Sequence, residues 1–354
     1  MAESPQKPLS AREKTVLRYV VHDFIETATP IGSRFISRKH EDVLGLSSAT
    51  IRNIMSDLED QGYLGHPHTS AGRVPTDLGY RVYLDTLMEM ERLSREDLRE
   101  IHKNLGTMEA ANEQDLVLRE SSRLLSRISR QLGVVSAPDL NSGTFEKLEL
   151  VQISSSRLMV IISLRAGLVR TIMLEVPSEI AREKLEEIGR HLNERLSGLT
   201  LDQIRETFPE RVREVQDDQT GLIRLFIESV DRLFPAGRSD RLHIAGAETI
   251  LEQPEFVNPR DLRGVIELIN NEEIIIHVLA KTESRPHEIT VRIGNENADE
   301  KLRPYSVITS TYSLGDVSGT IGVIGPTRMR YSRMIPLVDY VARTISDMFS
   351  QKTH

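Results

Sequence analysis

The sequence predicts a multidomain α+β protein, and three observations support this fold class. First, a chain of 354 residues is long enough for two or three domains with cores of their own. Second, apolar residues recur at helical spacing through the first part of the chain, whereas from Glu146 the apolar runs are short and separated by turn residues. Third, both kinds of pattern alternate toward the C-terminus. We therefore expect a helical N-terminal part, followed by sheets that helices cover.

Three helices are expected to build a small core near the N-terminus. Ser10 and Glu13 form a capping box that begins a helix ending near Thr29, and its buried stripe consists of Val16, Leu17, Val20, Val21, Phe24 and Ile25. A short helix is expected over residues 33–40. After a break at Gly45, Ser47 is the expected N-cap of a helix that stops at Gly62. The apolar stripe of this helix consists of Ile51, Ile54, Met55 and Leu58.

A β-hairpin is expected after the third helix. Residues 63–64 and 73–74 can pair as short strands around GHPHTSAG, because glycine, proline and small residues suit a protruding loop. Thr76 then caps a further amphipathic helix. The order helix, short helix, turn, longer helix and hairpin is typical of a winged helix-turn-helix domain. In such domains the longer helix enters the major groove of double-stranded DNA.

The polar face of the 47–62 helix supplies the candidate base contacts. Arg52 suits a guanine edge, Asn53 suits an adenine edge, and Ala49 suits a thymine methyl group. The other recognition-helix candidates are small hydroxyl residues that suit phosphates or nearby base edges, namely Ser47, Ser48, Thr50 and Ser56. The hairpin and the short helix add candidates for phosphate or minor-groove contact, namely Ser33, Arg34, His66, His68, Thr69, Ser70 and Arg73.

Each of these assignments has a simpler alternative. His66 and His68 could form half of a metal site, although no third ligand lies nearby in the sequence. Asn53 could bond locally to backbone, and Arg52 could pair with Asp57 or the adjacent serine. The net charge of −8 argues against a positive field over the whole protein, so any surface that binds nucleic acid must be local. The pattern as a whole is more specific than any single residue in it.

Four segments are more specific than the helix pattern alone. They are TPIGSRFIS, LSSATIRNIMSDLEDQGYL, HPHTSAGRVPTDLGYRVYLD and GVIGPTRMRYSRMIPLVDYVAR. Through them the chain resembles, over nearly its whole length, the HrcA family of heat-inducible transcription repressors. The resemblance implies a homodimer that binds an inverted-repeat operator upstream of chaperone genes and is kept active by the chaperonin GroEL. Ile54 and the pair Gly65-His66 depart from the family pattern, so the preferred operator sequence is expected to differ in detail.

The middle of the chain predicts a sheet with helices on one face. After a charged helical linker at residues 89–100, a helix is expected from residue 112 to 130, with a hinge at Gly133. The runs KLELVQIS, RLMVIISL and LVRTIMLEV are expected to form an antiparallel three-stranded meander. Three helices follow, one over residues 178–196, one that a capping box at Thr200 and Gln203 begins, and one over residues 222–233.

The C-terminal part predicts a second sheet. Its strand candidates are LHIAG, IIIHVLA, EITVRIG, SVITSTYSL and SGTIGVIG, with helices over residues 259–269 and 331–349. The helix before Gly133 is expected to pack on this sheet, which makes the meander an insertion. The resemblance implies a GAF-like domain that an inserted dimerisation domain interrupts. The expected boundaries are 1–90 for the winged helix-turn-helix, 91–143 with 240–354 for the GAF-like domain, and 144–239 for the insertion.

Chemistry other than DNA binding is sparse in the sequence. One glycine series fits neither a Walker loop nor a dinucleotide fingerprint and suits strand turns better, namely Gly315, Gly319, Gly322 and Gly325. Three arginines suit a solvated or partner-facing surface better than an anion site, namely Arg328, Arg330 and Arg333. Because cysteine is absent and no nucleophile, acid/base or paired-histidine motif is present, we expect no enzymatic activity, metal or cofactor. The alternative is an effector-sensing regulator, since GAF-like folds often bind small molecules.

The sequence also bears on the cellular location of the protein and on its assembly. No apolar run approaches the length of a membrane span and residues 1–10 lack a signal-peptide pattern, so a cytoplasmic protein is expected. One recognition helix reads too few base pairs to select a genomic site, which favours a dimer. The insertion is the expected dimer surface because its strands are apolar on both alternating sets, with Met159 and Ile161 in one set. Heat is expected to act through the stability of the dimer.

Overall fold

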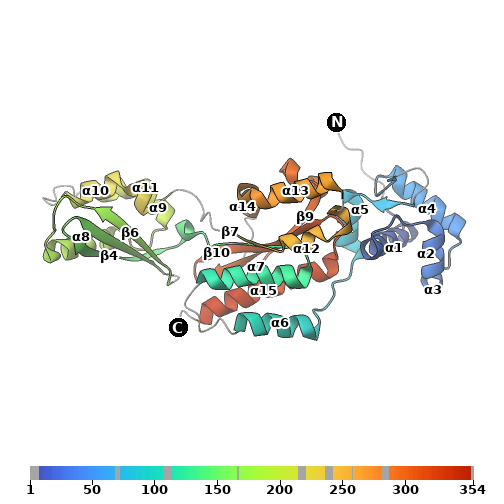
Figure 1. Cartoon of the computed structure of the whole chain (residues 1–354), viewed down its shortest axis with the longest axis horizontal. Helices are drawn as coiled ribbons and strands as arrows, with labels where there is room; N and C mark the ends of the chain where they lie inside the picture. The colour runs from blue at the N-terminus through green and yellow to red at the C-terminus, as the bar shows by residue number, and fades with distance from the viewer. Residues whose placement is uncertain are drawn as a thin grey trace. The chain divides into compact units, whose positions relative to one another are not determined.

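The computed structural model describes residues 8–67, 72–106, 114–165, 167–213, 221–235, 242–256, 258–280 and 287–351. The chain forms two compact units, and Figure 1 shows its elements. The first unit contains residues 1–135, 242–310 and 321–342, and the second contains residues 136–241, 311–320 and 343–354. Each unit combines helices with β-strands. The mixed α+β class predicted from the sequence is therefore confirmed.

The N-terminal part of the first unit consists of helices and a short hairpin. Its elements are α1 (Ala11–Thr27), α2 (Ser33–Lys39), α3 (Glu41–Leu44), α4 (Ser48–Asp60), β1 (Leu64–Gly65), β2 (Val74–Pro75) and α5 (Asp77–Val82), which the π-helical turn η1 (Tyr83–Leu87) extends. The predicted caps are confirmed at Ser10, Ser47 and Thr76. The predicted hairpin is present, with Leu64 opposite Pro75. Helix α3 was not predicted, and it occupies the expected turn before Gly45.

Apolar side chains hold these helices together. Helix α4 packs against α1 and α2. The buried apolar side chains of these three helices are Val16, Leu17, Val20, Val21, Ile25, Ile36, Ile51, Met55 and Leu58. Phe24 and Ile54, which the sequence places in the same stripes, are only partly buried. Because the stripes recur every three or four residues, one face of each helix is buried and the other is left at the surface.

A five-stranded sheet, most of whose residues belong to the first unit, organises the rest of that unit. Its order is β7-β3-β10-β9-β8, and its strands are β3 (Leu132–Ser136), β7 (Leu242–Ala245), β8 (Ile289–Ile293), β9 (Tyr305–Leu314) and β10 (Val317–Pro326). On one face lie α12 (Ala247–Leu251), α13 (Pro259–Asn270) and α14 (Glu272–Ala280), which share a buried apolar cluster with the strands. On the other face lie α7 (Gln114–Ser129) and α15 (Tyr331–Gln351), with α6 (Arg95–Gly106) beyond them (Figure 1). The 3-10 turns η4 (Pro254–Phe256), η5 (Gly294–Glu296) and η6 (Glu300–Leu302) connect these elements.

One predicted strand of this sheet is wrong. Residues 274–280, IIIHVLA, form most of helix α14. Ile274, Ile275, Val278 and Leu279 are buried together at helical spacing in the apolar cluster, so tertiary packing outweighs the β preference of isoleucine and valine. The fifth strand is instead β3, in the region where the sequence predicts a hinge. The predicted packing of α7 on the sheet is confirmed by its contact with β7.

The second unit contains the predicted three-stranded meander. Strands β4 (Phe145–Ser154), β5 (Arg157–Leu164) and β6 (Val169–Glu175) pair antiparallel in chain order, after the 3-10 turn η2 (Leu140–Ser142). The helices are α8 (Arg182–Leu196), α9 (Leu201–Arg211), α10 (Leu222–Glu228) and α11 (Val230–Leu233). The capping box at Thr200 is confirmed. Two boundaries differ from prediction, because α8 begins at Arg182 and the expected last helix is broken at Ser229.

The two faces of the meander differ in exposure. Leu158, Val160 and Ile162 of the central strand are buried, on the face that α8 helps to cover (Figure 1). On the opposite face, register places Met159 beside Val151 and Met173, and Ile161 between Glu149 and Thr171. We call the apolar residues of this second face the open sheet face; they are Val151, Met159, Ile161, Val169 and Met173. Val169 is 58% exposed and Met173 is 41% exposed.

Candidate nucleic-acid interface

Helix α4 has one apolar and one polar face, as the sequence predicts. Ile51, Met55 and Leu58 are buried against α1 and α2. On the other side, Ala49, Arg52 and Asn53 are exposed and Ser56 is half-buried. Since these side chains come from the first turns of the helix, they share one surface at its N-terminal end. The side chains of this surface are short except for that of Arg52, the only charged residue in the first two turns of α4.

Hydroxyl groups fix the N-terminus of α4. The Ser47 side chain accepts a hydrogen bond from the Thr50 backbone N–H at 3.1 Å, and the two hydroxyl oxygens lie 2.9 Å apart. Ser47 and Thr50 are exposed, whereas Ser48 is half-buried. Ser47 therefore has a structural role as a cap in addition to its predicted contact with phosphate. The cap leaves the other N–H groups of the first turn directed outward, where they favour an anion.

The local alternatives for Arg52 and Asn53 are not observed. Within the described ranges, no residue forms an ion pair with Arg52 or a side-chain hydrogen bond with Asn53. Arg52 does not pair with Asp57, although both lie on the same helix. Both polar groups are thus available at the surface of α4.

A buried acidic residue, which sequence reasoning missed, fixes helix α2 on helix α1. The Asp23 side chain is fully buried, with one oxygen 2.6 Å from Lys39 Nζ and the other 2.8 Å from His40 Nε2. The His40 ring also stacks on Tyr19, with centroids 3.9 Å apart. Asp23 stands within the apolar stripe of α1, and a single acid at such a position is the signal that could have revealed it. We call Asp23, Lys39 and His40 the α1–α2 anchor.

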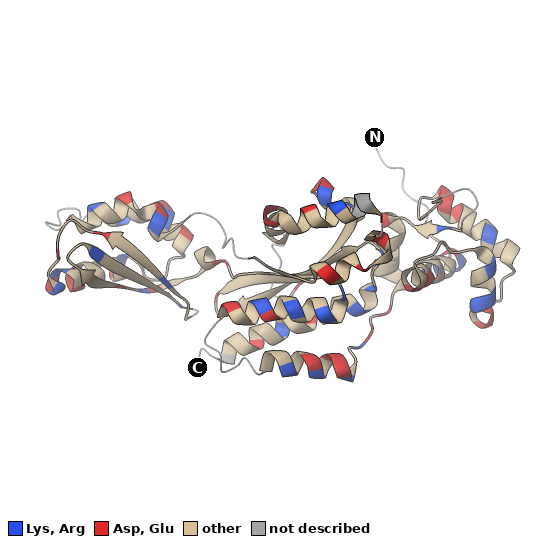
Figure 2. Cartoon of the chain, in the orientation of Figure 1, with Lys and Arg blue, Asp and Glu red and all other residues tan. Residues whose placement is uncertain are grey.

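Helix α2 presents basic residues next to α4. Figure 2 shows basic positions along α2. Arg34 is exposed and Ser33, the first residue of the helix, is half-buried. Lys39 also lies 5.5 Å from the centre of the exposed Phe35 ring. Exposed Arg34 and Arg38 therefore place positive charge at the surface of α2, although the net charge of the chain is −8.

The hairpin is held at its base by an ion-pair cluster. Arg73 lies 2.7 Å from Glu59 of α4 and 3.0 Å from His66 Nδ1, and His66 Nε2 lies 3.3 Å from the same glutamate. The backbone of Arg73 also exchanges two hydrogen bonds of 2.8 Å with Ile31. A Cβ atom at Gly72 would lie 2.4 Å from the Ile31 carbonyl, so this close crossing requires glycine.

The structure thus gives Arg73 a structural partner that the sequence did not reveal, since Glu59 lies on a different element. Its side chain is only 19% exposed. The predicted contacts of His68, Thr69 and Ser70 lie outside the described residues. Among the described residues, no three His, Asp or Glu side chains converge on a possible metal site.

Polar contacts connect these N-terminal elements with the five-stranded sheet inside the first unit. Asp77 of α5 accepts hydrogen bonds from the Asn295 backbone N–H at 2.9 Å and from the Asn295 side chain at 2.7 Å. Arg81 donates to the Val291 carbonyl at 2.7 Å and pairs with Glu296. Near the C-terminus of α1, Arg328 donates a hydrogen bond of 2.6 Å to the carbonyl of Ile25.

We call these contacts the polar seam. It also includes ion pairs from Arg328 to Glu255 and from Arg330 to Glu26. All three arginines for which the sequence predicts a solvated or partner-facing surface are therefore occupied within the chain, since Arg333 also pairs with Asp97 at 2.9 Å. The helices that carry the α4 surface are tied to the sheet by charged and amide groups.

The fold and this surface define a class: a mixed α+β protein that presents a capped helix with a polar face beside a β-hairpin, as DNA-binding regulators do. The chain belongs to the HrcA family. The model of the HrcA protein C-terminal domain matches residues 115–335.

Relatives over the full length support this assignment. The chain is 39% identical to the heat-inducible transcription repressor HrcA of Chlorobium luteolum (strain DSM 273 / BCRC 81028 / 2530), over 97% of this chain and 99% of the relative. It is 40% identical to the protein of that name from Prosthecochloris aestuarii (strain DSM 271 / SK 413), over 97% of this chain and 98% of the relative. A crystal structure of a hypothetical protein is 25% identical, with a TM-score of 0.58 over 98% of this chain and 100% of that one. No helix in the described ranges combines the length and apolar character that crossing a membrane requires.

Proposed function

We propose that this protein is a heat-inducible transcription repressor that binds double-stranded DNA through a winged helix-turn-helix domain at residues 1–90. The observation that carries this proposal is the exposed surface of Ala49, Arg52 and Asn53 opposite the buried stripe of α4. A helix that packs on two others and directs such side chains outward suits the major groove, where base edges offer hydrogen-bond acceptors and methyl groups. The names of the relatives support the same function.

The side chains of α4 divide into base-reading and positioning groups. Arg52 suits the O6 and N7 acceptors of guanine, Asn53 suits the N6 and N7 groups of adenine, and Ala49 suits a thymine methyl group. The remaining candidates suit phosphates and fix the register on the duplex, namely Ser33, Arg34, Ser47, Ser48, Thr50, Ser56 and His66. Arg73 combines this role with its ion pair to Glu59.

The active species is proposed to be a homodimer. An inverted repeat presents the same half-site twice with two-fold symmetry, which two copies of α4 can match. The open sheet face is the proposed contact, because its methionine, valine and isoleucine side chains are apolar and partly exposed. An apolar face of this kind marks a protein interface in soluble proteins. The insertion at residues 144–239 would then be a dimerisation domain, and residues 91–143 with 240–354 the GAF-like domain.

Heat is proposed to act on assembly. A dimer whose protomers unfold or dissociate loses operator occupancy steeply, because dimer formation depends on the concentration of folded protomers. The polar seam would pass such a loss of structure from the sheet to the helices that carry α4. The resemblance implies that the operator lies upstream of chaperone genes and that GroEL promotes the active form, which would link repression to the supply of free chaperonin.

Footprinting tests the proposal directly. The full-length protein is added to the DNA upstream of the chaperone genes of its own genome, with and without GroEL. We expect symmetric protection of an inverted repeat that GroEL strengthens. Protection that instead requires a metabolite would favour the effector-sensing regulator, and absence of protection on any duplex would refute DNA binding.

A further inference from the structure

A groove follows the outer side of strand β7 in the first unit. It has a volume of about 1020 Å³, and all residues from Leu242 to Gly246 line it. Strand β7 is an edge strand, since among the described residues it pairs only with β3. An edge strand presents unpaired backbone N–H and C=O groups, which can bond to an extended chain laid beside it. The groove therefore offers a place for one more strand.

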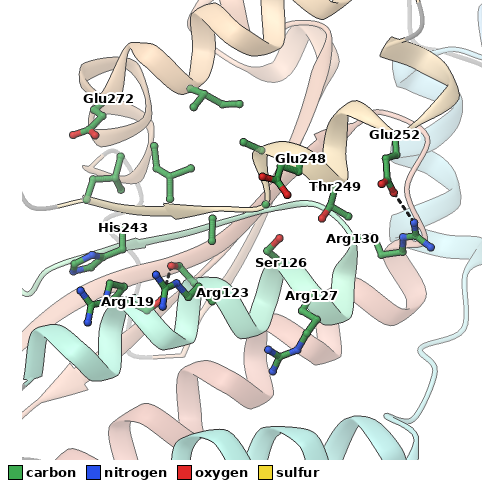
Figure 3. Close-up of a pocket in the computed structure, with 17 residues that line it drawn as sticks. Arg119, Arg123, Ser126, Arg127, Arg130, His243, Glu248, Thr249, Glu252 and Glu272 are labelled. Carbon is green, nitrogen blue, oxygen red and sulfur yellow. Dashed lines mark hydrogen bonds and ion pairs between the residues drawn. The ribbon is translucent and has the colours of Figure 1, made fainter.

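The two walls of the groove differ in chemistry because side chains alternate along β7. Leu242 and Ile244 pack toward the apolar cluster that α12, α13 and α14 cover, and Ile269 of α13 lies on the same wall. His243 lies on the opposite side, with its Nε2 atom 3.3 Å from an Asp115 carboxylate oxygen on α7 (Figure 3). The first wall combines these apolar side chains with the carboxylates of Glu248 on α12 and Glu272 on α14, whereas the α7 wall is polar throughout.

The polar wall is basic. Arg119 and Arg123 extend from successive turns of α7 toward the side of the strand that carries His243 (Figure 3). Both are exposed. Arg123 lies 2.5 Å from Glu120 on its own helix, whereas no described residue forms an ion pair with Arg119. Arg119 thus supplies positive charge that no described residue neutralises, at the end of the wall away from Arg130.

The far end of the groove is closed. Arg130, the residue after α7, and Glu252 form an ion pair of 3.0 Å there (Figure 3). At Gly246 the backbone has a φ of +92°, and a Cβ atom would lie 1.8 Å from Ser126 Oγ. The strand therefore ends directly against α7, and the groove admits a segment about as long as β7. A strand of this length carries two side chains toward each wall.

We propose that β7 binds an extended segment of another protein as an added strand, in which acidic residues alternate with apolar ones. The acidic side chains would lie over Arg119 and Arg123, and the apolar ones over Ile269 and the side chains of Leu242 and Ile244. Backbone hydrogen bonds would supply affinity that does not depend on sequence, and the two walls would supply the selectivity. The proposal is independent of DNA binding.

Charge disfavours a second copy of this chain as the occupant. Two β7 strands paired antiparallel keep corresponding faces of the two sheets on the same side. Such a pair would bring the α7 wall of one copy next to the α7 wall of the other. Like charges at Arg119 and Arg123 would then meet across the interface, which is unfavourable.

Three labelled peptides of about ten residues test the proposal on the full-length protein, with binding measured by fluorescence anisotropy. The first alternates Glu with Val, the second has Lys in place of Glu, and the third is the first with alternate backbone nitrogens methylated. We expect the Glu peptide to bind at least about tenfold more tightly than either of the others. Equal binding of the methylated peptide would show charge attraction without strand addition and would overturn the proposal, as would no binding at about 1 mM.

A charge reversal assigns the site. Arg119→Glu should weaken binding of the Glu peptide about tenfold and strengthen binding of the Lys peptide, because Arg119 has no structural partner to lose. Arg182→Glu, at an exposed position on α8, is the matched control and should change neither. Circular dichroism confirms that both variants fold. Unchanged peptide binding in Arg119→Glu would refute the site. Self-association of the wild-type protein that the peptide competes away would show that a second copy is the occupant instead.

Discussion

The α1–α2 anchor permits a prediction with a defined magnitude. Asp23→Ala removes a fully buried carboxylate that holds Lys39 and His40. The contact with His40, whose side chain is 13% exposed, should contribute about 1.5–3 kcal/mol as a hydrogen bond to a charged group. The Lys39 side chain is 43% exposed, so solvent screening reduces its share to about 0–1 kcal/mol. We expect the variant to lose about 1.5–4 kcal/mol of local stability at α2.

Hydrogen exchange on the full-length protein measures this loss. The opening constants of α2 amides should rise about 10-fold to 900-fold, whereas amides of the second unit should keep their rates. Asp23→Asn, which keeps one acceptor, should give an intermediate effect. Asp60→Ala makes the same change of charge at an exposed residue of α4 and should change local stability by less than about 0.5 kcal/mol. Unchanged exchange at α2 in Asp23→Ala would refute the anchor.

Four further predictions concern the surface, the hairpin, the dimer and pH. Arg52→Ala should weaken operator binding by about 1–3 kcal/mol and relax base preference at one symmetric pair of positions. The control Arg224→Ala on α10 should change neither. An unchanged ratio of binding to operator DNA and to DNA of scrambled sequence would make Arg52 a positioning residue. Arg73→Ala should speed hydrogen exchange in β1 and β2, because it removes the ion pair with Glu59. If Arg73 also contacts phosphate, the variant should lower by about one the slope of log operator affinity against log salt concentration. Faster exchange with an unchanged slope would assign Arg73 to the hairpin base alone. Ile161→Asp should reduce the dimer fraction in sedimentation and weaken operator binding. The matched control Ile266→Asp, at an exposed isoleucine of α13, should leave both unchanged. A dimeric Ile161→Asp protein would refute the open sheet face as the interface. Burial raises the pKa of Tyr80 and Tyr331 above 10. As pH rises past about 10, the unfolded state therefore loses these protons first, and the free energy of unfolding falls. Thermal unfolding should show this fall, and Tyr331→Phe should make its pH dependence shallower.

Local chemistry explains which elements were predicted. The caps at Ser10, Ser47, Thr76 and Thr200 depend on residues within one helical turn, so the sequence contains all that determines them. The meander was predicted because its strands follow one another along the chain. The two faces of α4 were predicted for a similar reason, since one helix carries both.

Contacts between distant segments explain the rest. Residues 274–280 are apolar without alternation, a pattern that fits a buried strand or a buried helix, and only their packing against α13 decides for the helix. Strand β3 finds its partner in β10, far along the chain. In the candidate site, Glu59 meets Arg73 across the hairpin base, and Asp23 meets His40 across two helices. Neither pair has a local signature that would identify it.

The pairing of β3 with β10 also has a consequence for how the protein is made. Val135 lies opposite Ile321, so the central strand pair of the sheet joins residues 186 positions apart. At a synthesis rate of about 5–20 residues per second, β3 waits roughly ten to forty seconds on the ribosome before its partner emerges. During that time the apolar side chains of α7 and β3 stay exposed, because the rest of the sheet that buries them has not yet been made. Chaperones bind exposed apolar surface of this kind on nascent chains. We therefore expect the yield of folded protein to fall when chaperones are occupied by other chains.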